Sequence, residues 1–357
     1  MISIESGQVI NIIVDKKKLQ KLEVLYQNGE SIRAILYKQF APAANVGDKV
    51  LANRTAGKLK LGTGGFDFIV ANLTNPDFTQ ETEGHIMKLR YTPLQVAIKS
   101  VEEDVSNYHE LFEKNSSLAG FPVIIGSLHS MVAPAVIGAI SSKPNVRIAY
   151  IMTDGASLPL AFSETVADLM EKKLIMGTIT YGHAFGGDLE AVNVYTALLA
   201  AKYCLKADLA IVAMGPGIVG TSTIFGHTGV EQGEIANAVA SLEGTPIIVP
   251  RISFLDPRPR HQGFSHHTVT VLTRICRAEA IVSMPELKDL SQQLIQAQLK
   301  VHNLTSKYKF FAKESSKAMK LAADLNLHFS TMGRDAKQES IFFEAAIAAG
   351  IIACELT

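Results

Sequence analysis

The fold is decided by the stretch Asp208-Leu-Ala-Ile-Val-Ala-Met214, which is followed directly by Gly215-Pro-Gly217. Its hydrophobicity is continuous rather than alternating, which indicates a strand that is buried on both faces. Five other runs share this character: Pro122–Gly126, Arg147–Met152, Leu174–Ile179, Thr245–Val249 and Glu279–Ser283. The stretches 158–173, 189–205 and 230–242 between runs are each long enough for one crossover helix. The sequence therefore predicts an open α/β domain with a largely parallel, Rossmann-like sheet covered by helices.

The first 88 residues have a different pattern, with short strands predicted at 9–14, 22–26, 31–37, 49–52 and 66–70. Asn28-Gly29 is a hairpin signal between the second and third of them. This spacing predicts a small antiparallel β-barrel module over residues 1–88. The α/β domain then occupies 89–357 and ends in a helical extension that includes 338–352. The module lacks exposed aromatics interleaved with Arg, which favours a scaffold or interface role.

Composition excludes several classes of protein. The chain is 47% hydrophobic and carries 34 basic against 34 acidic side chains, so neither a disordered chain nor a nucleic-acid partner is expected. Its longest apolar stretches, such as 131–140, are half the roughly 20 residues that a membrane span needs. Lys16-Lys17-Lys18 follows an acidic residue, which is the wrong order for a secretory signal. The three cysteines form no CxxC. We expect a cytoplasmic protein.

Chemically active side chains gather in the segments that follow the predicted strands. Ligands of open α/β sheets bind outside the carboxyl ends of the strands, and six of the ten histidines fall in these segments. The candidates for acid/base catalysis are Asp154, His183, Asp188, His227, His261 and His266. We expect the loops that carry them to converge on one crevice, together with Thr221 and Arg258.

The loop after Met214 contains a literal GxGxxG at Gly215, Gly217 and Gly220. A nicotinamide site is not favoured, because the segment continues as a loop to Gly229 and no acidic residue ends the next strand. Backbone N–H groups here could instead hold an anion, with help from the hydroxyls of Thr221, Ser222 and Thr223 and from a helix beginning near Val230. A purely structural glycine turn fits the pattern equally well.

The loop after Val249 carries Arg251, Arg258 and Arg260 around a single acid, Asp256. Guanidinium groups suit phosphate or carboxylate, so these arginines predict an anionic ligand. The alternative is a metal site built from His266 and His267 with His261 or Asp256. Adjacent histidines usually point in different directions, however, and three arginines repel a cation. We therefore assign no metal ligand, and the cofactor stays unassigned.

Four segments resemble an uncharacterised protein family, a domain of unknown function found in Gram-positive bacteria. They are Val46–Val50, Ala184–Asp188, Gly229–Asn237 and Ser253–Gln262, the last with Ser265–Thr268. The resemblance extends over nearly the full chain. It implies no activity, cofactor or catalytic residue, because the family has none assigned.

The residues themselves favour an enzyme that acts on a small phosphorylated, nucleotide or carboxylate substrate. The alternative is a metabolite-binding or assembly protein that uses the same loops without turnover, with the barrel module mediating association into a homo-oligomer. No GxSxG elbow, Walker A motif or HExxH is present, so the reaction class is not indicated.

Overall fold

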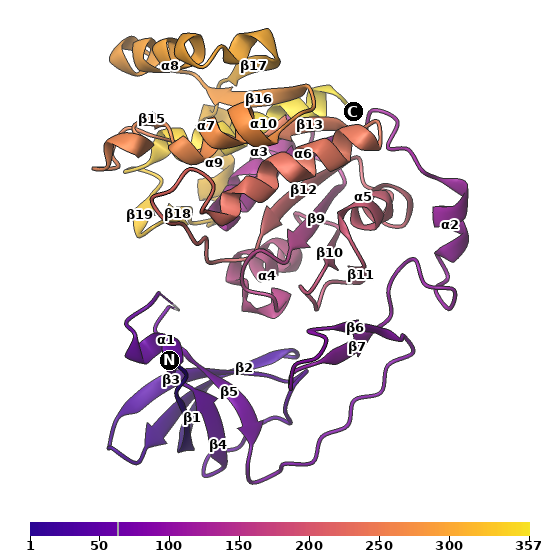
Figure 1. Ribbon diagram of the computed structural model, residues 1–357, viewed down its shortest axis with the longest axis vertical. Helices are drawn as coiled ribbons and strands as arrows, with labels where there is room; N and C mark the ends of the chain where they lie inside the picture. Colours follow the sequence, from indigo (N-terminus) through magenta and orange to yellow (C-terminus); the bar gives the residue numbers. More distant parts are fainter. Residues whose placement is uncertain (63) are drawn as a thin grey trace. The chain divides into compact units, whose positions relative to one another are not determined.

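The computed structural model describes residues 1–62 and 64–357 (Figure 1). It contains two compact units, Met1–Ile98 and Lys99–Thr357. The first unit holds a closed five-stranded barrel and the second an eight-stranded parallel sheet with helices, which confirms the predicted fold class. Among the described residues, none of the helices has the length and apolar character to cross a membrane.

The barrel closes in the order β1-β2-β3-β5-β4, with β4 pairing back to β1. Strand β1 is long enough to pair with both neighbours, and register shifts after Val9 and Ile12 let it bend around the barrel. Side chains such as Leu22 and Leu36 fill the interior. One pairing, β3 with β5, is parallel. The strands are β1 Ile4–Asp15, β2 Leu19–Tyr26, β3 Ser31–Tyr37, β4 Lys49–Asn53 and β5 Asp67–Asn72.

Two further elements belong to the first unit. A single helical turn, α1 (Thr55–Lys58), follows β4. A hairpin of β6 (Ile86–Lys88) and β7 (Val96–Ile98) extends the unit past residue 88, because the two strands pair with each other.

The sheet of the second unit has the order β11-β10-β9-β12-β8-β13-β16-β17, and every neighbouring pair is parallel. The six predicted strands are all present. Strands β11 and β17 were not predicted, and β11 lies inside a stretch predicted to be helical. The bounds are β8 Pro122–Ile125, β9 Ile148–Thr153, β10 Gly177–Tyr181, β11 Leu189–Ala191, β12 Leu209–Met214, β13 Thr245–Ile248, β16 Ala280–Pro285 and β17 Tyr308–Lys313.

Helices cover both faces of this sheet. Alternate residues of β12 belong to different cores, since Ile211 lies in the cluster that also holds residues of α3, α9 and α10, and Val212 in the one that also holds residues of α5, α6 and α8. This two-sided burial explains the continuous hydrophobic runs. The helices are α2 His109–Lys114, α3 Val132–Ser142, α4 Glu164–Glu171, α5 Val194–Tyr203, α6 Glu231–Ser241, α7 His266–Thr270, α8 Asp289–Val301, α9 Ser316–Asp324 and α10 Ser340–Glu355.

The strand order reverses direction between β12 and β8. From β8 the chain crosses through α3 to β9 on one side, whereas from β12 it crosses through α6 to β13 on the other. Such a reversal leaves a crevice outside the carboxyl ends of the two strands. The fold therefore places the loops after β8, β12 and β13 at the usual position of a ligand site.

Candidate functional site

A short hairpin after β13 positions most of the candidate site. Strand β14 (Ile252–Ser253) pairs with β15 (Gly263–Phe264), so the two ends of the loop that carries Arg258 and Arg260 lie side by side. His261 ends a 3₁₀ turn just before β15. Directly after β15, Ser265 caps α7 by accepting a hydrogen bond from the backbone N–H of His267. The base of the hairpin thus brings His261 close to the helix that begins with His266 and His267.

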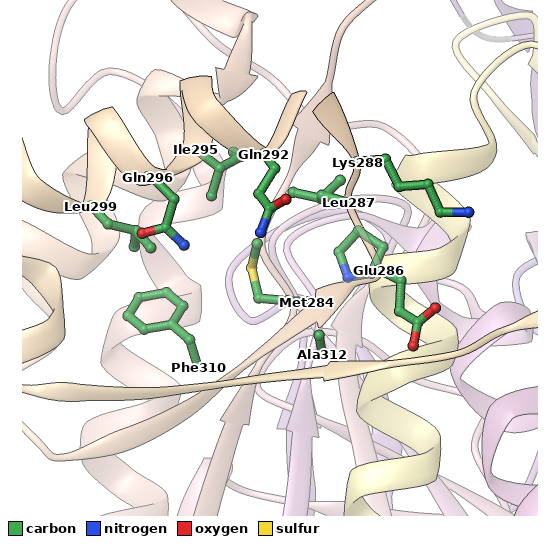
Figure 2. A pocket seen from close by; sticks show the side chains of 11 residues that line it. Met284, Glu286, Leu287, Lys288, Gln292, Ile295, Gln296, Leu299, Phe310 and Ala312 are labelled. Carbon is green, nitrogen blue, oxygen red and sulfur yellow. The ribbon is translucent and has the colours of Figure 1, made fainter. Parts of the chain in front are cut away.

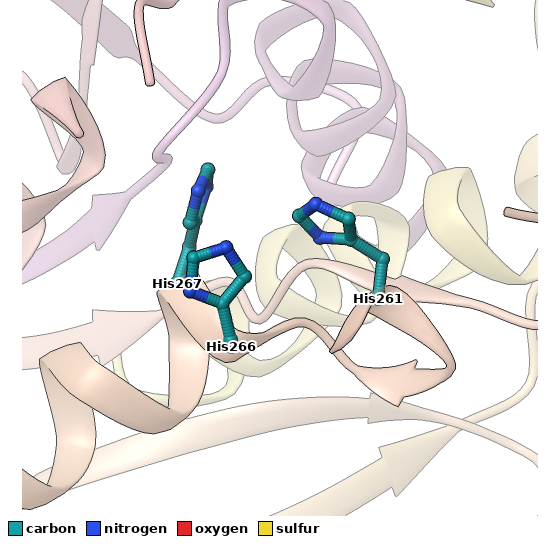
Figure 3. Close-up of side chains that lie close together, drawn as sticks. All are labelled: His261, His266 and His267. Carbon is teal, nitrogen blue, oxygen red and sulfur yellow. The ribbon is translucent and has the colours of Figure 1, made fainter. Parts of the chain in front are cut away.

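The side chains of these three histidines point toward one another (Figure 3). One ring nitrogen from each lies within 4.8 Å of the other two. The ring centroids are 4.3 Å apart for His266 and His267, and 4.9 Å apart for His261 and His266. A fourth ring, that of His227 from the loop before α6, stacks on His267 at 3.9 Å with the planes 11° apart. We call these four residues the histidine cluster.

The cluster is buried and short of hydrogen-bond partners. The exposed fractions of His227, His261 and His267 are 5%, 2% and 7%. Nδ1 of His261 lies 2.7 Å from the hydroxyl of Ser265. In contrast, Nε2 of His266 and Nδ1 of His267 are buried without a hydrogen bond. Buried polar atoms normally have partners, so this group of unpaired nitrogens is typical of a site that a ligand completes.

The surroundings of all four rings favour the neutral form. Burial, followed by the neighbouring His227 and His266, lowers the pKa of His267 to about 2. Burial and then the charge of Arg251 lower the pKa of His261 to about 4. Burial is also the main cause that lowers the pKa values of His227 and His266. Neutral imidazoles offer lone pairs, which can accept a proton or bind a metal ion.

The three predicted arginines have different surroundings. Arg258 donates two hydrogen bonds to Asp256, from Nε at 2.8 Å and from the terminal nitrogen at 2.7 Å, and its side chain is half-exposed. This pairing lowers the pKa of Asp256 well below its usual range. Arg260 is exposed. Arg251 is only 4% exposed, so it is the buried one of these three arginines.

The guanidinium of Arg251 has little compensation for its burial. Its nearest carboxylate oxygen, on Asp256, is 3.6 Å away, and its terminal nitrogen makes a 3.3 Å contact with the sulfur of Met332. Burial lowers the pKa of Arg251 to about 10, which still leaves it charged at neutral pH. Its charge helps to lower the pKa values of all four histidines, which places it beside the cluster.

A distant segment contributes Met332. Strands β18 (Ser330–Thr331) and β19 (Arg334–Asp335) form a two-residue hairpin whose turn, Met332-Gly333, has positive φ at both positions. Glu339 anchors this segment by accepting from Ser253 at 2.9 Å and by pairing with Arg334 at 3.0 Å. Nothing in the sequence links Met332 to Arg251, which lies far away along the chain.

The glycine-rich loop packs against the cluster. Gly220 pairs with His227 in a β-bridge, and a methyl group added at Gly220 would lie 3.6 Å from the ring of His267. The hydroxyl of Thr221 bonds to that of Thr223 at 2.9 Å and to the carbonyl of Gly226 at 3.0 Å. These hydroxyls therefore hold the loop in shape. Of the other predicted anion-binding residues, Ser222 is exposed at the loop tip, and Gly215 and Gly217 lie against Ala156.

A family comparison covers most of the chain. The model of DUF3866, described as a protein of unknown function, matches residues 33–350. This chain belongs to the DUF3866 family. The resemblance to an uncharacterised family is thereby confirmed. No curated protein matches the chain.

In this DUF3866 protein two other predicted residues form a second group. The carboxylate of Asp154 accepts the backbone N–H of His183 at 3.0 Å. Nearby, both carboxylate oxygens of Glu231 lie 3.0 Å from the hydroxyl of Thr153. Thr153 and Asp154 lie at the end of β9, and β12 and β8 stand between β9 and β13. That separation is about 14 Å at the usual strand spacing. Asp154 and His183 thus form a group at the ends of β9 and β10, and Glu231, which was not predicted, lies beside Thr153.

Asp188 lies in a third place. Its carboxylate accepts from the backbone N–H and the hydroxyl of Thr178, both at 2.8 Å. Thr178 is near the start of β10. Since β11 runs parallel to β10, the chain must return toward the start of β10 before β11 begins, and Asp188 lies on this returning segment. Asp188 therefore does not reach the carboxyl-end edge that the other candidates share.

A separate pocket of about 340 Å³ lies between α8 and strands β16 and β17 (Figure 2). Apolar side chains such as Ile295, Leu299 and Phe310 line it, with Gln292 and Lys288 among the polar ones. None of the residues predicted from the sequence lines this pocket.

Of the predicted residues, the structure brings together His227, His261, His266 and Arg251, and Arg258 and Arg260 lie close enough for their charges to lower the pKa of His266. His267 joins them. The sequence named His267 only in the metal alternative, which was not adopted, because the directions of two adjacent histidine rings cannot be predicted from their order in the chain.

Proposed function

We propose that this protein is an enzyme that acts on a small anionic substrate, phosphorylated, nucleotide or carboxylate, at the carboxyl ends of the parallel strands. The observation that carries the proposal is Arg251. A buried guanidinium without a carboxylate in hydrogen-bond range is costly, because it loses water and gains no strong acceptor in return. Its contacts are a sulfur atom and a carboxylate 3.6 Å away. An anionic group of a substrate would supply the missing acceptors.

Local charge supports the same ligand class. Asp256 stands between Arg251 and Arg258, so one carboxylate faces two guanidinium groups. Asp256 already receives both hydrogen bonds from Arg258. The remaining positive charge lies beside four neutral histidines, which do not offset it. An anion bound at Arg251 would therefore balance the site electrostatically.

The cluster supplies the chemical groups for a reaction. Neutral imidazoles next to a bound anion can accept or relay a proton, and His266 and His267 each have a buried nitrogen without a hydrogen bond. We assign anion binding first to Arg251, while Arg260 and the loop from Gly215 to Thr223 border the site. We keep the expectation of a cytoplasmic bacterial protein, which rests on composition and sequence alone.

The binding part of the proposal is tested by calorimetry with inorganic phosphate, AMP and acetate. We expect Arg251→Gln to weaken binding of the tightest of these probes about 10- to 100-fold, as the loss of a charge-assisted hydrogen bond predicts. Arg277→Gln is the matched control, since it removes the same charge from an exposed side chain outside the site, and should change affinity less than about threefold. Equal effects of the two variants, or no binding of any probe, would contradict the proposal.

The catalytic part needs a separate measurement. Chromogenic phosphate monoesters, phosphate diesters and carboxylate esters are offered to the wild type and to His227→Gln. Turnover by the wild type that His227→Gln loses, while phosphate binding is kept, supports an enzyme. Binding without turnover of any substrate would instead support a metabolite-binding protein.

A further inference from the structure

We propose that His261, His266 and His267 bind one divalent transition-metal ion of the zinc class. The inference deepens the proposed function, because the metal would serve that same site, and it rests on that function for its role. The binding of the metal itself can be tested without knowing the substrate.

The geometry of the three rings is close to that of a metal centre. One nitrogen from each ring lies within 4.8 Å of the others. Zinc–nitrogen bonds of about 2.0–2.1 Å in a tetrahedral site put ligand nitrogens roughly 3.3 Å apart. The rings must therefore move together by about 1 Å, which small side-chain rotations provide.

The rings of the adjacent residues His266 and His267 do not point away from each other, contrary to the expectation from the sequence. His266 and His267 open α7, and their ring centroids lie 4.3 Å apart. His261 approaches from the other side of β15 and completes the group. The hairpin base, rather than the order of residues along the chain, determines this convergence.

The unpaired nitrogens are an independent observation. Nε2 of His266 and Nδ1 of His267 are buried without a hydrogen bond, and the side chain of His267 is more than nine-tenths buried. Two buried nitrogens of this kind, side by side, are costly unless something binds their lone pairs. A metal ion does so directly.

A second contact orients His261. Nδ1 of this ring lies 2.7 Å from the hydroxyl of Ser265, whose oxygen can accept the Nδ1 hydrogen. That tautomer leaves the Nε2 lone pair for a metal. Histidine ligands commonly donate their other N–H to a neighbouring oxygen in this way, which fixes both tautomer and ring orientation.

The donor set selects the class of metal. Three imidazole nitrogens suit zinc, cobalt, nickel or copper, whereas magnesium and calcium prefer oxygen ligands. Three protein ligands also leave a fourth position open, as in catalytic zinc sites. Arg251 repels the ion but favours an anion at that position. The positive charge of Arg251 would therefore stabilise an anionic oxygen of water or substrate bound there.

The test uses the full chain without a polyhistidine tag. After metal removal with a chelator, the protein is dialysed against Zn²⁺ or Mg²⁺ and the bound metal is counted by mass spectrometry, while Co²⁺ loading is followed by visible absorption. We expect one Zn²⁺ per chain, no stoichiometric Mg²⁺, and the intense visible bands of four- or five-coordinate Co²⁺. Failure to retain Zn²⁺, or the weak spectrum of six-coordinate Co²⁺, would overturn the proposal.

Variants assign the ligands. His261→Gln, His266→Gln and His267→Gln should each weaken Zn²⁺ binding at least about 100-fold. His302→Gln is the control, because His302 is an exposed histidine at the end of α8, and should bind Zn²⁺ as the wild type does. Equal Zn²⁺ affinity of all four variants would contradict the assignment. If a buried variant fails to fold, His266→Gln, whose side chain is less buried, and the wild-type Co²⁺ spectrum still decide the matter.

The two proposals can fail separately. Arg251→Gln should keep the Zn²⁺ stoichiometry while it loses inorganic phosphate. Zn²⁺ binding without any phosphate, AMP or acetate binding would overturn the proposed function and leave the metal site standing. Binding of phosphate by a protein that retains no Zn²⁺ would overturn the metal site alone.

Discussion

The hydroxyl oxygen of Ser265 lies 2.7 Å from Nδ1 of His261. The two residues flank the two-residue strand β15 in the chain, His261 before it and Ser265 after it. The same oxygen accepts the backbone N–H of His267 at 3.3 Å and caps α7. A single side chain therefore fixes the ring of His261 and the start of the helix that carries the other two proposed ligands. Its removal should affect both stability and metal binding.

Replacement of Ser265 tests whether one side chain supports both the stability of α7 and the binding of the metal. We expect Ser265→Ala to lower the free energy of unfolding by about 1 kcal/mol, because the helix loses its N-cap. Zn²⁺ affinity should fall about 10- to 100-fold, since the His261 ring loses the group that orients it. Chemical denaturation measures the first effect, and competition with a chromophoric chelator measures the second.

Ser163 provides a matched control. It caps α4 by accepting the N–H of Val166 at 3.0 Å, and its oxygen lies 2.7 Å from Nε2 of His129, so it combines a cap with a histidine contact outside the cluster. Ser163→Ala should cost a similar amount of stability and leave Zn²⁺ binding unchanged. If both variants weakened Zn²⁺ binding equally, orientation of His261 would not be the cause.

Helices α3 and α10 touch through their backbones at two glycines. A methyl group at Gly138 would lie 2.1 Å from the carbonyl oxygen of Ile347, and one at Gly350 would lie 2.1 Å from that of Ala135. Both distances are far inside van der Waals contact. A side chain at either position therefore requires the helices to separate.

This contact reverses the usual effect of a Gly→Ala change. At an exposed helical position the change stabilises by up to about 1 kcal/mol through helix propensity. Here we expect Gly350→Ala to destabilise by on the order of 1–3 kcal/mol, as overpacking does. Ser142→Ala, at the exposed end of α3, should stay within about 0.5 kcal/mol of the wild type in the same denaturation experiment. A Gly350→Ala protein more stable than the wild type would show that the helices do not pack this closely.

The sequence predicted the strands that lie inside the sheet, and for a clear reason. Residues such as Ile211 and Val212 face opposite cores, so both must be apolar. The two missed strands lack this signature. Strand β17 is an edge strand with exposed residues among Tyr308–Lys313, and β11 has only three residues. Edge and very short strands carry little hydrophobic pattern.

The site was predictable as a region and not as a set of contacts. Arg251, Arg258 and Arg260 are equivalent in the sequence, and only the structure separates the buried one from the one paired with Asp256. In the same way, the direction of adjacent rings such as those of His266 and His267 depends on the hairpin that precedes them. Asp188 followed a predicted strand, but the chain turned back after that strand ended.

Glu231 is a half-buried carboxyl group outside the histidine cluster. Its oxygens lie 3.0 Å from the hydroxyl of Thr153, and Asp154 and Glu234 are close enough to disfavour its ionised form. Burial, the largest cause, raises the pKa of Glu231 from 4.5 to about 7. The unfolded chain therefore ionises this group at a lower pH than the folded protein does.

Because the pKa of Glu231 is higher in the folded than in the unfolded state, the protein should lose stability as the pH rises. Below pH 4.5 the carboxyl is protonated in both states and costs nothing. Between pH 4.5 and 7 only the unfolded state loses the proton, so the free energy of unfolding falls as pH rises, by on the order of 3 kcal/mol in total. Glu231→Gln should thus match the wild type at pH 4 and exceed its stability at pH 8. Glu171→Gln, an exposed glutamate at the end of α4, should shift neither value in urea denaturation. A stability gain from Glu231→Gln that is the same at both pH values would place its cause in packing rather than in ionisation.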